Sequence, residues 1–237
     1  MRKGRSDVID HKARHPTQER SQRRFDTILA ATEELLQTAN IEDISFYDIA
    51  RKARISPASV HYLFPTMAAV RIEISKLYNQ QSSGGVVEAQ RQLAKMRNAT
   101  WQEWIRIVAE KTRSHFNANR HICEVLLGPL LHRESRLANM RANDVIGRSL
   151  LENLRSVFLV PDIPGLEQKF VIISEIVDAL WSRAYLLNGW IDDEAFEETV
   201  RVQIAYLRSV LPESLPLVRA DAQIAPHRTV DASYNAA

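Results

Sequence analysis

Several features that would define common protein classes are scarce in this chain of 237 residues. The single cysteine, Cys123, excludes an intramolecular disulfide and suits a reducing compartment. Its thiol is interpreted as a small buried hydrophobe, with a redox sensor as the alternative. No apolar run approaches the ~20 residues of a membrane-spanning helix, and the N-terminus lacks the apolar core of a signal peptide. The sequence therefore predicts a cytoplasmic protein without a membrane partner.

Motifs of catalytic and metal centres are missing as well. The sequence has no glycine loop for phosphate, no nucleophile elbow and no Cys/His set with zinc spacing. The histidines at positions 115, 121 and 132 do not share a helix face at metal-ligand spacing. We therefore expect no enzyme, no metal and no cofactor.

The composition favours an all-α protein, and its charge is unevenly distributed. Only seven glycines occur, with 45% hydrophobic and 25% charged residues, a composition that suits helices better than sheets. The net charge is +2, but residues 1–24 carry eight basic and three acidic side chains. Residues 1–21 are predicted to be a disordered basic arm, which either follows DNA phosphates or is only a solvated tail.

Residues 22–70 contain short helices with capping residues at their starts. The segment from Phe25 to Ala39 has the apolar spacing of one helix face. Ser45 is predicted to cap a second helix, with Asp48 completing a capping box. Ser56 precedes a proline at the first position of a third helix, and Thr66 caps a fourth. Two very short helices behind a longer one predict a helix-turn-helix.

These segments together resemble the TetR family of one-component transcriptional repressors. The resemblance rests on residues 28–31, 44–50 and 55–65. It implies that 22–70 is a DNA-binding domain whose recognition helix, 56–64, enters a major groove of double-stranded DNA. Hydroxyl, aromatic and basic side chains of this domain are the expected DNA contacts: Arg24, Ser45, Tyr47, Ser56, Pro57, Ala58, Ser59, His61, Tyr62 and Thr66.

The sequence departs from the family at four positions of this domain. Asn40 and Arg54 stand where the family usually has glycine, at helix ends where a left-handed residue is common. His61 replaces a phosphate-binding tyrosine, and Met67 replaces a lysine. Fewer phosphate contacts are therefore expected from the usual positions.

Residues 71–212 are predicted to be a helical-bundle domain for ligand binding and dimerisation, followed by a flexible tail at 213–237. Helices are expected at 101–117, 121–131, 135–159, 166–188 and 194–211. The last two are strongly apolar, and the resemblance implies that they pair with a second subunit; a purely internal core is the alternative. The expected dimer contacts are Phe170, Ile173, Val177, Phe196, Val200, Ile204, Leu207 and Leu211.

The resemblance also implies a ligand cavity within this second domain. Aromatic and sparse polar residues on facing helices are its expected lining: Trp104, His115, Phe116, Met140, Asn143, Ile146, Glu175, Asp178, Trp181 and Tyr185. Each of these can also be an ordinary core residue. Residues 178–183 resemble the corresponding stretch of choline-responsive regulators, where aromatic rings and a carboxylate would suit a quaternary ammonium.

The function predicted from these features is a homodimeric repressor that binds a palindromic operator. A small, largely apolar effector is expected to release it from DNA. An adaptor or coactivator of the same fold, without specific operator binding, is the alternative that the changes at His61 and Met67 keep open. A helical-bundle enzyme is a third and weaker possibility.

Overall fold

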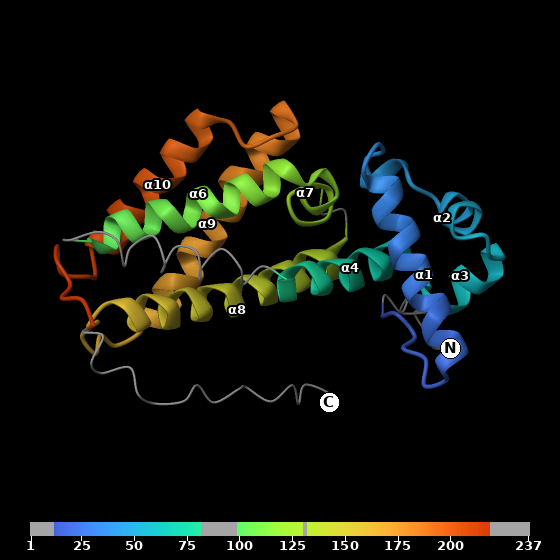
Figure 1. Cartoon of the computed structure of the whole chain (residues 1–237), viewed down its shortest axis with the longest axis horizontal. Coiled ribbons are helices and arrows are strands. Elements are labelled where there is room, and N and C mark those ends of the chain that lie inside the picture. Colours follow the sequence, from blue (N-terminus) through green and yellow to red (C-terminus); the bar gives the residue numbers. More distant parts are fainter. Residues whose placement is uncertain (1–11, 82–98, 130–131, 219–237) are drawn as a thin grey trace, which may run out of the picture.

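The computed structural model describes residues 12–81, 99–129 and 132–218, and these ranges are helical, as predicted (Figure 1). One isolated bridge joins Phe158 and Leu217. None of the described helices is long and apolar enough to span a membrane. The elements are α1 (Glu19–Leu36), the short 3-10 turn η1 (Ile41–Asp43), α2 (Phe46–Ala53), α3 (Pro57–Leu63), α4 (Met67–Gln81), α6 (Trp101–Ala118), α7 (Arg120–Leu126), α8 (Arg133–Val157), α9 (Leu166–Asn188) and α10 (Asp193–Arg208).

The predicted helix caps of the N-terminal domain are confirmed. The Ser45 hydroxyl accepts a hydrogen bond from the Asp48 amide at 3.3 Å, and the Asp48 carboxylate accepts one from the Ser45 amide at 3.1 Å. Ser56 accepts from the Ser59 amide at 3.3 Å. Thr66 accepts from an amide in the first turn of α4 at 3.2 Å. Each cap satisfies a backbone donor that the first helical turn leaves free.

The first helix begins earlier than the apolar pattern predicted. It starts at Glu19, because its polar first turns are supported by pairs four residues apart, including Arg23 with Glu19 at 2.5 Å. The preceding residues lie against the domain, where the Arg14 amide donates to the Leu63 carbonyl at 2.8 Å. The predicted disordered arm at 1–21 therefore excludes residues 12–21, and residues 1–11 lie outside the described ranges.

Helix α4 joins the two halves of the molecule. Its Ile74 and Tyr78 are buried in the same core cluster as Phe25 and Phe64 of the N-terminal domain, and α4 also packs against α7 and α8. Figure 1 shows it running from the small helices α1–α3 towards the C-terminal bundle. The predicted boundary at residue 70 thus falls inside a continuous helix.

The C-terminal domain is built around the contact between α8 and α9. A Cβ added to Gly147 of α8 would lie 2.6 Å from the Val171 backbone of α9, so only glycine allows this close approach. On its other side α9 packs against α10, which also contacts α6. This arrangement explains why α9 is apolar around most of its circumference.

The chain beyond α10 remains packed for several residues. The Leu159 amide donates to the Pro216 carbonyl at 2.7 Å, and the Val218 amide donates to the Val157 carbonyl at 2.9 Å. Leu215 is buried in the cluster formed by α6, α8, α9 and α10. The flexible tail predicted from residue 213 therefore excludes residues 213–218, and 219–237 lie outside the described ranges.

Candidate nucleic-acid interface and ligand cavity

The recognition helix α3 has one buried and one exposed face. Val60 and Leu63 are buried, whereas Tyr62 is 64% exposed and Tyr47 of α2 is 70% exposed. Most other predicted DNA contacts are also at the surface: Arg24, Ser45, Ser56, Ala58 and His61 are exposed, and Pro57, Ser59 and Thr66 are half-buried. Large exposed aromatics are available to a partner without unfolding the domain.

The turn between α2 and α3 has the tight geometry of a helix-turn-helix. Arg54 has a φ of 56° and a ψ of 41°, the left-handed conformation that glycine usually supplies there. The Ile55 amide donates to the Ala50 carbonyl at 3.0 Å and closes the turn. Asn40 differs, because its backbone is extended with a φ of −78°. Asn40 and Arg54 both stand where the family usually has glycine. Only Arg54 has a strained backbone conformation.

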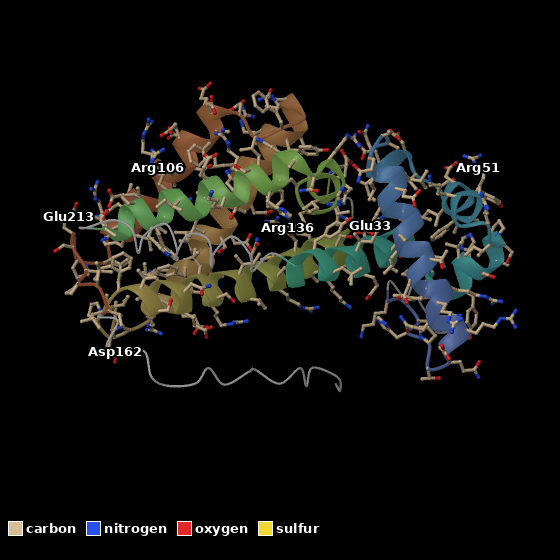
Figure 2. All side chains as sticks on the ribbon, viewed as in Figure 1. Glu33, Arg51, Arg106, Arg136, Asp162 and Glu213 are labelled. Carbon is tan, nitrogen blue, oxygen red and sulfur yellow. The ribbon has the colours of Figure 1, made fainter. Side chains whose placement is uncertain are left out.

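Arg14 is a basic residue of this surface that the sequence did not single out. Its guanidinium carbon lies 5.3 Å from the centre of the Tyr62 ring, a distance at which a cation is attracted to the ring face. This contact holds a positive charge beside the exposed end of α3. Figure 2 labels a second cation, Arg51, on the outer side of α2; it is paired with Asp48 at 2.6 Å.

The two family departures on this side have structural roles. The exposed His61 ring lies edge-on to Phe46, with ring centres 4.2 Å apart. Met67 is half-buried and packs against the N-terminal core. Met67 therefore contributes apolar packing where the family lysine would contribute charge.

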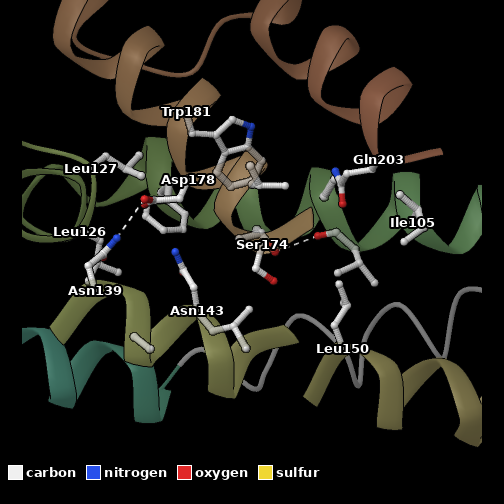
Figure 3. A pocket seen from close by; sticks show the side chains of 17 residues that line it. Ile105, Leu126, Leu127, Asn139, Asn143, Leu150, Ser174, Asp178, Trp181 and Gln203 are labelled. Atoms are coloured by element: carbon white, nitrogen blue, oxygen red, sulfur yellow. Dashed lines mark hydrogen bonds between the residues drawn. The ribbon is translucent and has the colours of Figure 1, made fainter. Parts of the chain in front are cut away.

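A cavity of about 150 Å³ lies between the helices of the C-terminal domain (Figure 3). Residues of α6, α7, α8, α9 and α10 line it. Five of the ten predicted lining residues are among them: Phe116, Asn143, Ile146, Asp178 and Trp181. Prediction missed others, including Thr112, Asn139, Ser174 and Gln203.

The other five predicted lining residues lie elsewhere, for different physical reasons. His115 and Met140 are on exposed helix faces, and Trp104 is fully buried in the core beside α8 and α9. Glu175 points to Arg136 at 3.3 Å, and the Tyr185 hydroxyl donates to Glu124. All five residues lie on helices that line the cavity, but their side chains are on faces that do not line it.

Among the lining residues that the structure describes, Asp178 is the ionisable one. Its carboxylate accepts from Asn139 at 2.9 Å and from Arg136 at 3.3 Å, the latter labelled near the centre of Figure 2. Burial raises the pKa of Asp178, while the hydrogen bond from Asn139 and the charge of Arg136 lower it. This carboxylate is thus already partnered at the edge of the cavity.

The predicted dimer contacts occupy the internal sides of α9 and α10. Phe170, Ile173, Leu207 and Leu211 are buried in the core with α6 and α8, and Phe196 and Val200 are buried against α6. Val177 lines the cavity, and Ile204 packs at the edge of both clusters. The prediction therefore chose the wrong faces. The outward face of α9 instead carries a stripe at helical spacing: Ile172, Ile176, Ala179, Arg183 and Leu187.

Helix α7 connects the cavity with the N-terminal domain. The buried Glu124 carboxylate accepts from the Ile41 amide at 2.9 Å and from the Tyr185 hydroxyl, and lies 3.3 Å from Arg120. Arg120 in turn donates to carbonyls at the end of α1, those of Leu36 and residue 39, at 2.7 and 2.8 Å. These polar bonds fix α7 to α1, to η1 and to α9.

A buried arginine of α4 holds the other end of α7. Arg71 donates to the carbonyls of Val125 at 2.6 Å and Gly128 at 3.1 Å, and also to that of Pro129. Burial lowers the pKa of Arg71 to about 10, with Glu124 acting in the opposite direction, so the side chain remains charged at neutral pH. Because residues 126 and 127 line the cavity, one helix contacts both the cavity and the DNA-binding domain.

Comparison with known proteins places these features in context. Residues 28–74 match the family described as bacterial regulatory proteins, tetR family. No similar sequence is found among curated proteins.

Solved structures share the fold over most of the chain. A TetR transcriptional regulator from Rhodococcus sp. RHA1 aligns with a TM-score of 0.61 and 11% identity, over 80% of this chain and 97% of that one. One from Streptomyces coelicolor gives 0.57 and 19%, over 79% and 99%. One from Haloarcula marismortui gives 0.55 and 15%, over 80% and 99%. At these identities the likeness establishes the fold.

Proposed function

We propose that this chain, a transcriptional regulator of the tetR family, is a ligand-responsive repressor that binds a palindromic operator as a homodimer. The observation that carries the proposal is the exposed face of α2 and α3, where Tyr47 projects from the first turn of α2 beside its Ser45 cap and Tyr62 projects from the last turn of α3. Helix N-termini with free N–H groups suit phosphate oxygens, and a helix of this size fits a major groove.

Individual roles follow from the chemistry of this face. Ser59 can bond to several base edges, and the Ala58 methyl can contact a thymine methyl. Tyr47, Tyr62 and Arg14 suit phosphate oxygens, which position the protein without reading sequence. We expect Arg14 to supply a cation in place of the family lysine at position 67, since it lies over the ring of the exposed Tyr62.

The outward stripe of α9 is the dimer surface that we propose. Ile172, Ile176 and Leu187 leave apolar surface on a helix whose other sides are already packed. A second copy would cover this surface and hold two recognition helices at the spacing of two operator half-sites, ~34–36 Å or a multiple of it.

The cavity is proposed to bind the effector, and α7 to transmit its presence. A ligand that pushes on residues 126 and 127 would displace the helix that Glu124, Arg120 and Arg71 tie to the DNA-binding domain. Release of DNA requires that the ligand binds more tightly to the displaced arrangement than to the DNA-bound one. The ratio of these two ligand affinities equals the factor by which the ligand weakens operator affinity.

Selection of duplexes from a random pool by the purified protein tests the DNA proposal. We expect enrichment of a palindrome, and a loss of roughly 13- to 160-fold per half-site in affinity for it in Tyr62→Ala, as for one hydrogen bond to a charged group. Leu159→Ala is the matched control, because Leu159 is a large apolar residue with similar exposure, 57%, that follows α8 and lies outside α2, α3 and the stripe of α9. Equal affinity for selected and random duplexes would instead support the adaptor alternative.

A salt titration tests the role of Arg14. Each neutralised phosphate contributes about −0.9 to the slope of log affinity against log salt. A dimer brings two copies of Arg14 to the duplex, so Arg14→Gln should make the slope less steep by about two such units, ~1.8, and should weaken selected and random duplexes by similar factors. An unchanged slope would remove Arg14 from the interface.

Sedimentation of a stripe variant tests the dimer. Ile176→Glu should give monomers at micromolar concentration, since an unpaired buried charge costs several kcal/mol. Val145→Glu is the matched control on the exposed face of α8 and should leave the oligomeric state unchanged. A monomeric parent protein that still selects a palindrome would refute the dimer proposal.

A further inference from the structure

The cavity contains three buried nitrogen donors that lack an acceptor. Within the part of the chain that the structure describes, Nδ2 of Asn143, Nε1 of Trp181 and Nε2 of Gln203 have no hydrogen-bond partner. The three residues are 5%, 2% and 4% exposed, and all of them line the cavity. They come from three different helices, α8, α9 and α10, and Figure 3 shows them around the same space.

Such donors are unusual in a folded interior. Nearly all buried polar groups are hydrogen-bonded, and an unpaired one loses its interaction with water without replacement. The carboxamides of Asn143 and Gln203 can rotate to present an oxygen instead. The Trp181 indole has no acceptor, so its N–H can only donate. Convergence of three such groups on one cavity indicates a binding partner that supplies acceptors.

The remaining polar groups of the lining do not supply these acceptors. The hydroxyls of Thr112 and Ser174 donate to carbonyls of their own helices, at 2.9 and 3.1 Å. The Asp178 carboxylate is engaged by Asn139 and Arg136. The amide oxygens of Asn139, Asn143 and Gln203 are further acceptors of the described lining, but none of them bonds to the three nitrogens. A bound molecule can supply the acceptor that these nitrogens lack.

The charges of the lining select among possible ligands. Among the described residues, no lysine, arginine or histidine lines the cavity, so a carboxylate ligand would be buried beside Asp178 without a cation of its own. A quaternary ammonium would lie against N–H donors, which do not stabilise a cation. The carboxylate of Asp178, which could attract it, is already paired with Arg136. The rings of Phe116 and Trp181 meet edge to face, 5.6 Å apart at 73°, and do not form parallel walls around a cation. An uncharged ligand fits best.

We propose that the cavity binds a neutral, mostly apolar molecule whose carbonyl or ether oxygens accept hydrogen bonds from Asn143, Trp181 and Gln203. The assignment rests on the proposed function of the cavity as an effector site. A cavity of this volume holds a ligand of ~6–10 non-hydrogen atoms, because one of similar size in another protein holds benzene. Neutral ketones, esters and lactones of that size have the required chemistry.

Four probes of nearly equal size test the proposal by calorimetry: acetophenone, α-methylstyrene, benzoate and phenyltrimethylammonium. Acetophenone and α-methylstyrene differ only by an oxygen in place of a methylene group. We expect acetophenone to bind ~2–10-fold more tightly than α-methylstyrene, the ratio for one neutral hydrogen bond, and more tightly than either ion.

Variants then assign the preference to the donors. Trp181→Phe, Asn143→Leu and Gln203→Leu should each lower the ratio of acetophenone to α-methylstyrene affinity, and a ratio cancels the effect of altered cavity shape. The control Thr112→Val removes a hydroxyl whose hydrogen already bonds to Val108, and should leave the ratio unchanged. The Leu variants should melt at the same or a higher temperature than the parent, because they remove an unpaired polar group.

Each other outcome overturns the proposal. Equal or tighter binding of α-methylstyrene would mean that the donors do not recognise the ligand. Preference for benzoate or phenyltrimethylammonium would mean that the ligand is charged, and no binding of any probe at millimolar concentration would exclude ligands of this size. These outcomes can be distinguished from a failure of the proposed function, because duplex selection by the unliganded protein does not depend on these probes.

Discussion

The hydroxyl of Tyr185 offers a direct test of how α9 is fastened to α7. Tyr185→Phe removes one oxygen and leaves the buried ring in place, so that no large cavity forms. Burial, followed by the hydrogen bond to Glu124, raises the pKa of Tyr185, and the phenol therefore stays protonated as a donor at all working pH values. The variant deletes the bond between these two helices and little else.

The expected loss of stability follows from the partners of Glu124. A hydrogen bond to a charged group contributes about 1.5–3 kcal/mol. Glu124 would retain the Ile41 amide and Arg120, so it would not become an uncompensated charge. We therefore expect the free energy of unfolding to fall by about 2 kcal/mol, which lowers the melting temperature by roughly 4–8 °C for a chain of this size.

Urea and thermal unfolding at one fixed protein concentration measure the effect, because dimer stability depends on concentration. Tyr206→Phe on α10 is the matched control, with an expected change within about 0.5 kcal/mol. Hydrogen exchange at the Ile41 amide should accelerate in Tyr185→Phe and not in the control. If Tyr185→Phe were as stable as the parent, the bond from Tyr185 to Glu124 would not fasten α9 to α7 as described.

Three further predictions concern single residues. Gly147→Ala should destabilise the protein to urea by about 1–3 kcal/mol, because its Cβ would overlap the α9 backbone; a stabilised variant would contradict the close helix contact. The bonds from Ser45 are the main cause that lowers the pKa of Asp48, so the capping box stabilises α2 at neutral pH and loses this contribution as pH falls through that lowered pKa. An NMR titration checks the pKa, and Asp48→Asn should remove the acid-dependent loss. Burial raises the pKa of Cys123 to about 12, and its thiol should react with Ellman's reagent only on unfolding; rapid labelling of the native protein would support a redox sensor.

The features that sequence predicted correctly are those set by neighbours along the chain. The caps at Ser45, Ser56 and Thr66 involve residues three positions apart, so composition and spacing determine them. The start of α1 was missed because its first turns are polar and depend on ion pairs such as Arg23 with Glu19. Apolar periodicity does not detect a helix of that kind.

The faces of α9 and α10 could not be assigned from sequence, because both helices have apolar residues on more than one side. Whether Phe170 or Ile172 faces the core depends on where α6 and α8 lie. Some of the cavity could have been found: Gln203 interrupts the buried stripe of α10, and Asn139 lies one turn before Asn143. A polar residue in an apolar stripe was the available signal.

Arg54 has a consequence for attempts to improve this protein. It is the only described non-glycine residue with a positive φ, and a side chain in that conformation costs roughly 1–2 kcal/mol relative to glycine. Screening variants by melting temperature would therefore favour Arg54→Gly. The same change would delete an exposed cation two residues before the cap of α3. At this turn, a change that raises thermal stability lowers the electrostatic attraction to a polyanion, so selection for one property would reduce the other.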